Sequence, residues 1–305
     1  MNKDIDRAID DYLQYLRSIK NYSVHTLKAY AHDLSLLSAY ITDYNLPFDS
    51  LSHTEVRRFT AALKRKEYAE RSINRIISGI KSFYRYEIRF TGLDRNPFSQ
   101  VRSMKKQRTL PTVLTIDEVR RILSAPGDDF IGARDRAVFH TLYSTGCRLS
   151  EMLSMNTDDV SFTYRKILVH GKGSKDRYVF LTRAAVHDLH LYMSLKQERA
   201  RKQKLQNTDN AAVFVNKMGK RLTPQGVHYI FHTYVTKLGI EKHVTPHTFR
   251  HTFATHLLDH DAGIRVVQEL LGHENISTTQ IYSHVGAKRL KEVYSKNHPH
   301  GRSES

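Results

Sequence analysis

The chain has little of what a secreted, disulfide-bonded or membrane-spanning protein needs. It contains a single cysteine, Cys147, which excludes an internal disulfide framework and fits a reducing compartment. No apolar run approaches the roughly 18–20 residues that a membrane span requires, and the acidic, amphipathic N-terminal stretch lacks the apolar core of a signal peptide. We therefore expect a cytoplasmic protein that does not enter a membrane.

Several common catalytic motifs are also missing. Neither GxGxxG nor GxxxxGK[ST], the loops that hold nucleotide phosphates, occurs in the chain, and no GxSxG elbow supports a serine nucleophile. His247 and His251 have the spacing of a zinc-binding helix, but position 248 is not glutamate and no cluster of cysteines or carboxylates supplies further ligands. The sequence therefore predicts no metal and no cofactor.

Positive charge is the clearest compositional signal. The 305 residues carry a formal net charge of +17, which points to a polyanionic partner such as nucleic acid. Residues 1–110 contain 20 Lys and Arg against 12 Asp and Glu, and the remainder contains 28 against 19. Because both halves share the excess, both are expected to touch the same polyanion.

The first 95 residues have the pattern of a small helical bundle. Apolar residues recur at helical spacing over residues 4–20 and in three further segments that begin at Ser23, Ser52 and Ser72. Ser52 and Glu55 form a capping-box pattern. Either a solvated face or a DNA-facing surface accounts for the basic residues of this bundle, which are Arg57, Arg58, Lys64, Arg65, Arg71, Arg75, Lys81 and Arg85.

A basic linker is expected over residues 96–112, because this stretch lacks helical periodicity and contains two prolines. A second domain then covers residues 113–305. Its helices are predicted from Thr115 to Ser124, over 133–143, over the CRLSEMLSM segment, from Ala184 onward, after Thr223 and Thr245, and over 287–294. Residues 166–170 and 177–181 predict a β-hairpin with a glycine-rich tip.

Side chains suited to phosphate chemistry are spaced along this second domain: Arg148, Lys172, His247, Arg250, His273 and Tyr282. Taken singly they have ordinary explanations. Arg148 and Glu151 stand three apart on a predicted helix and could form a surface ion pair. Lys172 could be a solvated turn lysine, and Lys175 at the same hairpin tip leaves open which lysine acts.

Together these residues fit attack on a phosphodiester. Negative charge builds on the non-bridging oxygens, which planar guanidinium groups match bidentately, so Arg148 and Arg250 could replace a metal ion. A tyrosine hydroxyl is a poor nucleophile at its ordinary pKa of about 10 and needs a base. We assign Tyr282 as the nucleophile, His247 as its base and Lys172 as the general acid for the leaving oxygen.

Two supporting roles complete this assignment. His273 is expected to donate a hydrogen bond to the phosphate, and Glu151 to orient an arginine or a histidine. A covalent bond between the tyrosine and the phosphate would conserve the bond energy, so that rejoining needs neither ATP nor metal.

The order of these motifs, GCRLSE, HGKGSKDR, HTFR, LGH and TTQIY, resembles the tyrosine site-specific recombinases, and most closely their Xer type. The resemblance runs along nearly the whole chain. Carried over by motif, the family's catalytic set falls on the six side chains named above. Two departures are minor: Cys147 precedes the arginine, and His170 precedes the GKG tip.

The resemblance implies a mainly α, two-domain clamp: a helical core-binding domain, and a catalytic domain with a small β-hairpin or sheet and a C-terminal docking tail. Double-stranded DNA at a specific site is the implied substrate. It further implies a homo- or hetero-tetramer on DNA, with a second recombinase possible, a tail that docks on the neighbouring protomer, and a DNA translocase as a possible activator.

The expected task is resolution of chromosome dimers at cell division. One alternative is an integrase of a mobile element, although the compact chain shows no extra N-terminal arm-binding domain. Two others are a type IB topoisomerase, which relaxes supercoils as a monomer, and a DNA-binding protein whose catalytic site has decayed.

Overall fold

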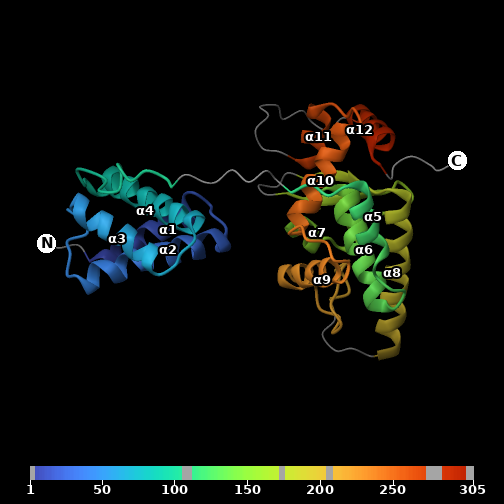
Figure 1. Cartoon of the computed structure of the whole chain (residues 1–305), viewed down its shortest axis with the longest axis horizontal. Helices are drawn as coiled ribbons and strands as arrows, with labels where there is room; N and C mark the ends of the chain where they lie inside the picture. Colours follow the sequence, from blue (N-terminus) through green and yellow to red (C-terminus); the bar gives the residue numbers. More distant parts are fainter. Residues whose placement is uncertain (1–3, 105–111, 172–175, 204–208, 273–283, 300–305) are drawn as a thin grey trace. The chain divides into compact units, whose positions relative to one another are not determined.

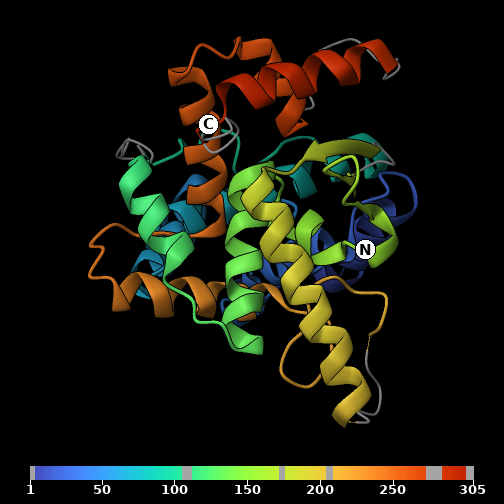
Figure 2. The ribbon, with the colours of Figure 1, turned by 90° about the vertical axis from the view of Figure 1, so that its right-hand side faces the viewer.

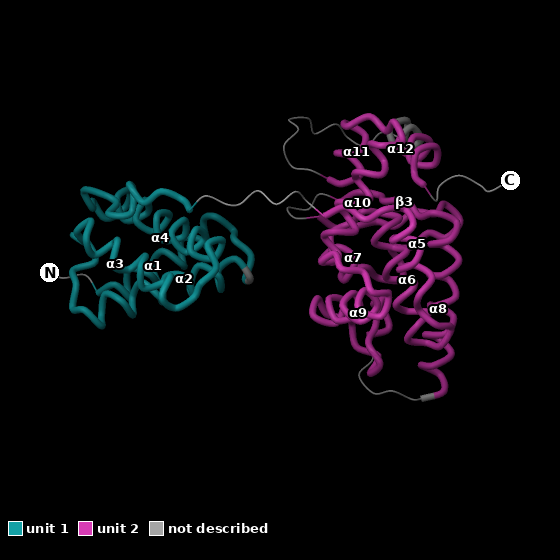
Figure 3. The backbone as a smooth tube through the Cα atoms, viewed as in Figure 1, with its two compact units in different colours: residues 1–109 teal, residues 110–305 magenta. Residues whose placement is uncertain are grey.

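Two compact units, Met1–Thr109 and Leu110–Ser305, make up the chain (Figure 1, Figure 3). The structure is a computed structural model that describes residues 4–104, 112–171, 176–203, 209–272 and 284–299. Each unit has its own hydrophobic core. Among the helices so described, none is long and apolar enough to cross a membrane.

The N-terminal unit is a bundle of four helices: α1 (Ile5–Ser18), α2 (Val24–Asp43), α3 (His53–Arg65) and α4 (Glu70–Thr91). The predicted capping box is confirmed, because the Ser52 backbone N–H donates to Glu55 Oε2 at 2.6 Å and the Glu55 N–H donates to Ser52 Oγ at 3.3 Å. Helix α4 begins two residues before the predicted start at Ser72, behind Ala69, whose side chain makes no cap hydrogen bond.

Part of the segment that the sequence assigns to the linker packs against this bundle. Phe98 is fully buried in the bundle core and stacks on Tyr84 with ring centroids 5.7 Å apart. The Asn74 side chain pairs with the Met104 backbone, donating to its carbonyl at 3.1 Å and accepting its N–H at 2.8 Å. Residues 96–104 are therefore held by the bundle, and residues 105–111 lie outside the described ranges.

The C-terminal unit is built around one of its own helices, the buried α6 (Phe130–Thr145). Asp129 caps its start, three residues before the predicted start at Ala133, by accepting the Gly132 N–H at 2.9 Å. The other helices are α5 (Ile116–Ser124), α7 (Leu149–Ser154), α8 (Arg183–Gln203), α9 (Pro224–Lys237), α10 (Pro246–Asp259), α11 (Ile264–Leu271) and α12 (His284–Asn297). Figure 2 shows the long helix α8 lying along α6, and α10 contacts both α6 and α11.

A small antiparallel sheet stands beside these helices. The predicted hairpin is confirmed as β2 (Lys166–His170) and β3 (Asp176–Phe180), paired from Lys166 with Phe180 to His170 with Asp176. A two-residue strand that the sequence did not reveal, β1 (Val160–Ser161), pairs with β2 after the short 3-10 turn η1 (Thr157–Asp159). Strands this short carry too little periodicity to be recognised by pattern.

Helix α12 packs on the C-terminal unit of its own chain, against α11 and β3 (Figure 2). Tyr294 is 3% exposed and lies 2.9 Å from Ser144 Oγ through its hydroxyl. The His298 ring, also buried, approaches the Tyr143 carbonyl oxygen at 3.3 Å. Helix α12 thus extends beyond the predicted 287–294. Its buried residues form a separate hydrophobic cluster with those of α10 and α11.

Candidate active site

The end of α6 places Arg148. Gly146 adopts φ +58° and its N–H donates to the Leu142 carbonyl at 3.0 Å, which closes the helix. A side chain at this position would lie 2.3 Å from the Phe253 ring, so the turn requires glycine for space as well as for conformation. Cys147 is then fully buried, and burial raises the pKa of its thiol to about 11. The thiol stays neutral, and Arg148 emerges as the cap of α7.

Glu151 holds Arg148 by two hydrogen bonds. The Arg148 backbone N–H donates to Oε2 at 2.8 Å, and Nη1 donates to Oε1 at 2.9 Å. The arginine side chain is 43% exposed, whereas the glutamate side chain is only 4% exposed. The pair therefore differs from an ordinary surface ion pair, because its acidic member is anchored in the protein interior.

Arg177 on β3 is the residue that sequence reasoning missed. Its Nη1 and Nη2 donate to the two oxygens of Glu151, both at 2.9 Å, and its Nε donates to the Leu270 carbonyl at 3.2 Å. Burial alone would raise the pKa of Glu151, but hydrogen bonds from Arg177 and from the Arg148 backbone hold it below its usual value. Glu151 is thus a carboxylate shared by two guanidinium groups.

A signal for Arg177 existed in the sequence. Side chains alternate between the two faces of a strand, and Arg177 shares its face with Val179, both of which are buried. An arginine on the inward face of a strand requires a buried acceptor, and Glu151 is the acidic residue that supplies it.

Helix α10 brings Arg250 to the same place. Its Nη1 donates to the Gly146 carbonyl at 2.6 Å and its Nη2 to the Leu271 carbonyl at 2.7 Å. Burial, together with the nearby charge of Arg148, lowers the pKa of Arg250 to about 10, which still leaves the group charged at neutral pH. His247 lies one turn earlier on α10 and is exposed. The predicted helix start at Thr245 and Pro246 is confirmed.

The three arginines converge on the C-terminal end of α11. Arg177 binds the carbonyl of Leu270, Arg250 that of Leu271, and Arg148 that of Gly272 at 3.2 Å. One carboxylate among three guanidinium groups leaves an excess of two positive charges. Such a site can bind a phosphodiester and stabilise the further negative charge that builds on its oxygens during attack.

Three of the predicted site residues lie outside the described ranges: Lys172, His273 and Tyr282. The structure does describe the residues that flank two of them, at the hairpin and at the end of α11. His170 and Asp176 form the last pair of the hairpin, with His170 Nδ1 lying 3.1 Å from Asp176 Oδ1. Hydrogen bonding to Asp176 raises the pKa of His170. Gly272, which precedes His273, ends α11 within the arginine cluster.

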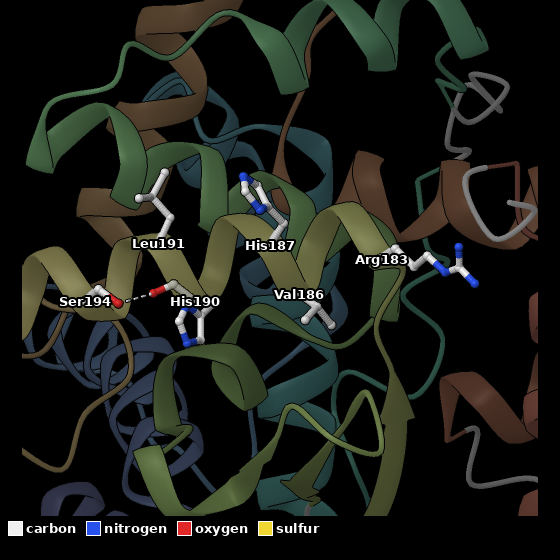
Figure 4. Close-up of a pocket in the computed structure, with 6 residues that line it drawn as sticks. All are labelled: Arg183, Val186, His187, His190, Leu191 and Ser194. Carbon is white, nitrogen blue, oxygen red and sulfur yellow. Dashed lines mark hydrogen bonds between the residues drawn. The ribbon is translucent and has the colours of Figure 1, made fainter. Parts of the chain in front are cut away.

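A shallow hollow of about 400 Å³ lies on α8 and includes none of these residues (Figure 4). All of its lining belongs to one helix: Arg183, Val186, His187, His190, Leu191 and Ser194. Over the described ranges, no three His, Cys, Asp or Glu side chains gather as a metal site would require.

Comparison with known proteins identifies the family. The phage integrase family matches residues 112–289, and the phage integrase N-terminal SAM-like domain matches residues 9–90. Together these matches cover both units. The chain belongs to the phage integrase family of tyrosine recombinases. Enzymes of this family cut and rejoin DNA through a tyrosine intermediate, so the recombinase chemistry that the motifs predicted is confirmed at the level of the family.

Known tyrosine recombinases are similar in sequence to this chain over almost its whole length. It is 39% identical to the tyrosine recombinase XerD of Oceanobacillus iheyensis over 97% of this chain and 99% of the relative. It is 35% identical to the tyrosine recombinase XerC of Treponema denticola over 97% of this chain and 100% of the relative. The Xer resemblance is therefore confirmed.

A solved structure supports the fold. The Tn1549 transposon integrase in complex with transposon right-end DNA is similar with a TM-score of 0.69, over 93% of this chain and 98% of that chain, at 20% identity. This likeness confirms the predicted mainly helical fold with its small sheet. Because the relatives that match this chain along its length are Xer recombinases, the mobile-element alternative is not favoured.

Proposed function

We propose that the arginine cluster is the phosphate-binding site of a DNA strand-transfer reaction. The observation that carries this proposal is the convergence of Arg148, Arg177 and Arg250 on the last carbonyls of α11, where Arg148 and Arg177 share the carboxylate of Glu151. The Arg148 side chain is 43% exposed, and Arg250 is partly buried. These two groups bind the non-bridging oxygens of the scissile phosphate, and their charge stabilises the transition state.

We propose the following bond changes at this site. Tyr282 attacks the phosphorus, its proton passes to His247, and a tyrosine–phosphate bond forms as the bond to the 5′-oxygen breaks. Lys172 donates a proton to that oxygen, while His273 donates a hydrogen bond to the phosphate. The DNA end stays attached as a 3′-phosphotyrosine. Attack by a 5′-hydroxyl of another strand then reverses each step, so that no ATP, metal ion or other cofactor is consumed.

Both units contribute to binding of the duplex in this proposal. The excess of positive charge is shared between them, and the linker that joins them is basic. Residues 1–95 act as the core-binding domain and residues 113–305 as the catalytic domain of a clamp. Because phosphate contacts release counterions, DNA affinity falls steeply as salt concentration rises. A slope of log K against log[salt] near zero would contradict the clamp.

At the level of the cell, we assign the recombinase to chromosome-dimer resolution in the cytoplasm. Full-length similarity to proteins named XerD and XerC supports this assignment. Exchange between two duplexes needs four cleavages, so the active form is a tetramer on DNA, either of one chain or of two related recombinases. A DNA translocase is the proposed activator. In that tetramer the tail is proposed to leave its own unit, where α12 packs on α11 and β3, and to dock on the neighbouring protomer.

The covalent complex itself provides the test. The recombinase is incubated with fragments of its own chromosome, the covalent adducts are isolated, and the attached DNA ends are sequenced. We expect 3′ ends at one site, with strand exchange between two copies of that site. Adducts spread over many sequences, with relaxation of supercoiled plasmid by a monomer, would instead indicate a type IB topoisomerase.

A further inference from the structure

Arg177 occupies a core position that a charged residue rarely takes. Its side chain is 5% exposed, and its partner across the hairpin is the buried Val169. Placing a guanidinium group in such a position costs several kcal/mol unless its donors are used. Three of them are used, two on Glu151 and one on Leu270.

The two parallel bonds from Arg177 fix the orientation of the Glu151 carboxylate. Each oxygen of that carboxylate also accepts one hydrogen bond from Arg148, Oε1 from the side chain and Oε2 from the backbone. Arg148 is thereby held at Nη1, and its Nη2 points to the Gly272 carbonyl. An exposed arginine that a buried carboxylate holds at a defined angle loses less side-chain entropy when it binds a phosphate.

The same side chain reaches the backbone that leads to His273. The last carbonyls of a helix lack donors within the helix and carry the negative end of its dipole. Helix α11 has no basic residue in its own last turn, so distant arginines take that place. Gly272 has φ +66°, and a Cβ there would lie 3.0 Å from the Arg177 guanidinium. The Arg177 guanidinium therefore packs directly against Gly272, the residue that precedes His273.

We propose that Arg177 is a positioning residue for phosphate binding: through Glu151 it orients Arg148, and through the end of α11 it holds Leu270 and Gly272 in place. This inference rests on the proposed function of the arginine cluster. Lysine cannot replace Arg177, because an ammonium group has no planar fork to span both carboxylate oxygens while also reaching a carbonyl.

The test uses a nicked suicide DNA that carries the mapped site, with the scissile phosphate either as a phosphodiester or as a neutral methylphosphonate. Single-turnover formation of the covalent complex is measured at saturating protein for wild type, Arg177→Lys and Arg134→Lys. Arg134 is the matched control, because it is also a buried arginine paired with a buried carboxylate, that of Asp135 on α6, and it makes no bond to the cluster among those described.

We expect Arg177→Lys to slow cleavage of the phosphodiester by about 10²-fold, as for a catalytic group displaced by about 1 Å, and to slow cleavage of the methylphosphonate less than about tenfold. Cleavage of the neutral methylphosphonate depends less on the charge of Arg148. The rate on the phosphodiester divided by the rate on the methylphosphonate should therefore fall in Arg177→Lys. The ratio does not depend on the fraction of folded protein. Arg134→Lys is expected to leave the ratio at its wild-type value, whatever it does to stability.

Equal losses on both substrates, or no loss, in Arg177→Lys would overturn the inference while leaving the proposed function intact. Should that variant be too unstable to assay, Glu151→Gln provides a second measurement, since it removes the carboxylate from Arg148 and must lower the same ratio. A wild-type protein that forms no covalent complex on the phosphodiester would instead refute the proposed function, and this inference with it.

Discussion

Tyr294 is predicted to anchor α12, the helix that begins two residues after Tyr282. Its ring lies 5.8 Å from that of Phe180 and 5.0 Å from that of His298, between centroids, and its hydroxyl lies 2.9 Å from Ser144 Oγ. Truncation of a large buried aromatic residue to alanine costs about 3–5 kcal/mol. Because only Leu290 is as deeply buried among the apolar side chains described for α12, most of this loss should appear as undocking of the helix.

Amide hydrogen exchange followed by mass spectrometry measures this directly. In Tyr294→Ala, protection of α12 should fall by about 10²- to 10⁴-fold, since each 1.4 kcal/mol is a factor of ten, or to the unprotected limit if docking is weaker than that. Tyr294→Phe keeps the ring and loses one hydrogen bond of about 1 kcal/mol, so its protection should fall less than about tenfold.

Two results would refute this reasoning. A change in α12 protection below about threefold in Tyr294→Ala would mean that the helix is not held by this side chain. An equal loss of protection in α6 and α12 would mean that Tyr294 supports the whole C-terminal unit rather than the docking of its last helix.

Two further predictions concern the arginine cluster and its supports. Gly146→Ala should destabilise the protein by at least about 2 kcal/mol in urea unfolding, because left-handed strain and overpacking each cost about 1–3 kcal/mol. In a Phe253→Ala background, which is itself less stable than wild type, the same glycine substitution should cost less, because the ring that blocks the new methyl group is gone. Glu151→Gln should cost about 3–5 kcal/mol at neutral pH. The lowered pKa of Glu151 means that its contribution is present above the ordinary value of 4.5 and is lost as the pH falls through the folded pKa, so the difference in melting temperature between this variant and wild type should shrink in acid.

The local structure could be predicted from the sequence because its signals are local. Ser52 with Glu55 and Pro246 after Thr245 are start signals that need only their own helix, and both are confirmed, as is the helix predicted from Thr115. Gly146 ends α6 for a reason that is equally local. The start of α4 was predicted incorrectly, because Ser72 is a good capping residue but the helix begins behind Ala69 without any side-chain cap.

Contacts between segments that are far apart in the sequence could not be predicted from hydrophobic periodicity. Arg177 and Glu151 are 26 residues apart, and Tyr294 lies 150 residues from Ser144. Such pairs follow from how the strand and helices pack, and no spacing in the sequence encodes them. Of the predicted site, Arg148, Arg250 and Glu151 are brought together, and His247 lies on the same helix as Arg250. The roles of Lys172, His273 and Tyr282 stay predictions.

Tyr282 is expected to form the covalent bond to DNA, and a single substitution tests this most directly. Wild type and Tyr282→Phe are incubated with the nicked suicide substrate, binding is measured by gel shift, and adducts are detected after denaturation. Wild type should form a covalent complex whose DNA-bearing peptide contains Tyr282, whereas Tyr282→Phe should bind the DNA with unchanged affinity and form none. A covalent complex of the phenylalanine variant, or an adduct on another residue of the wild type, would contradict the account.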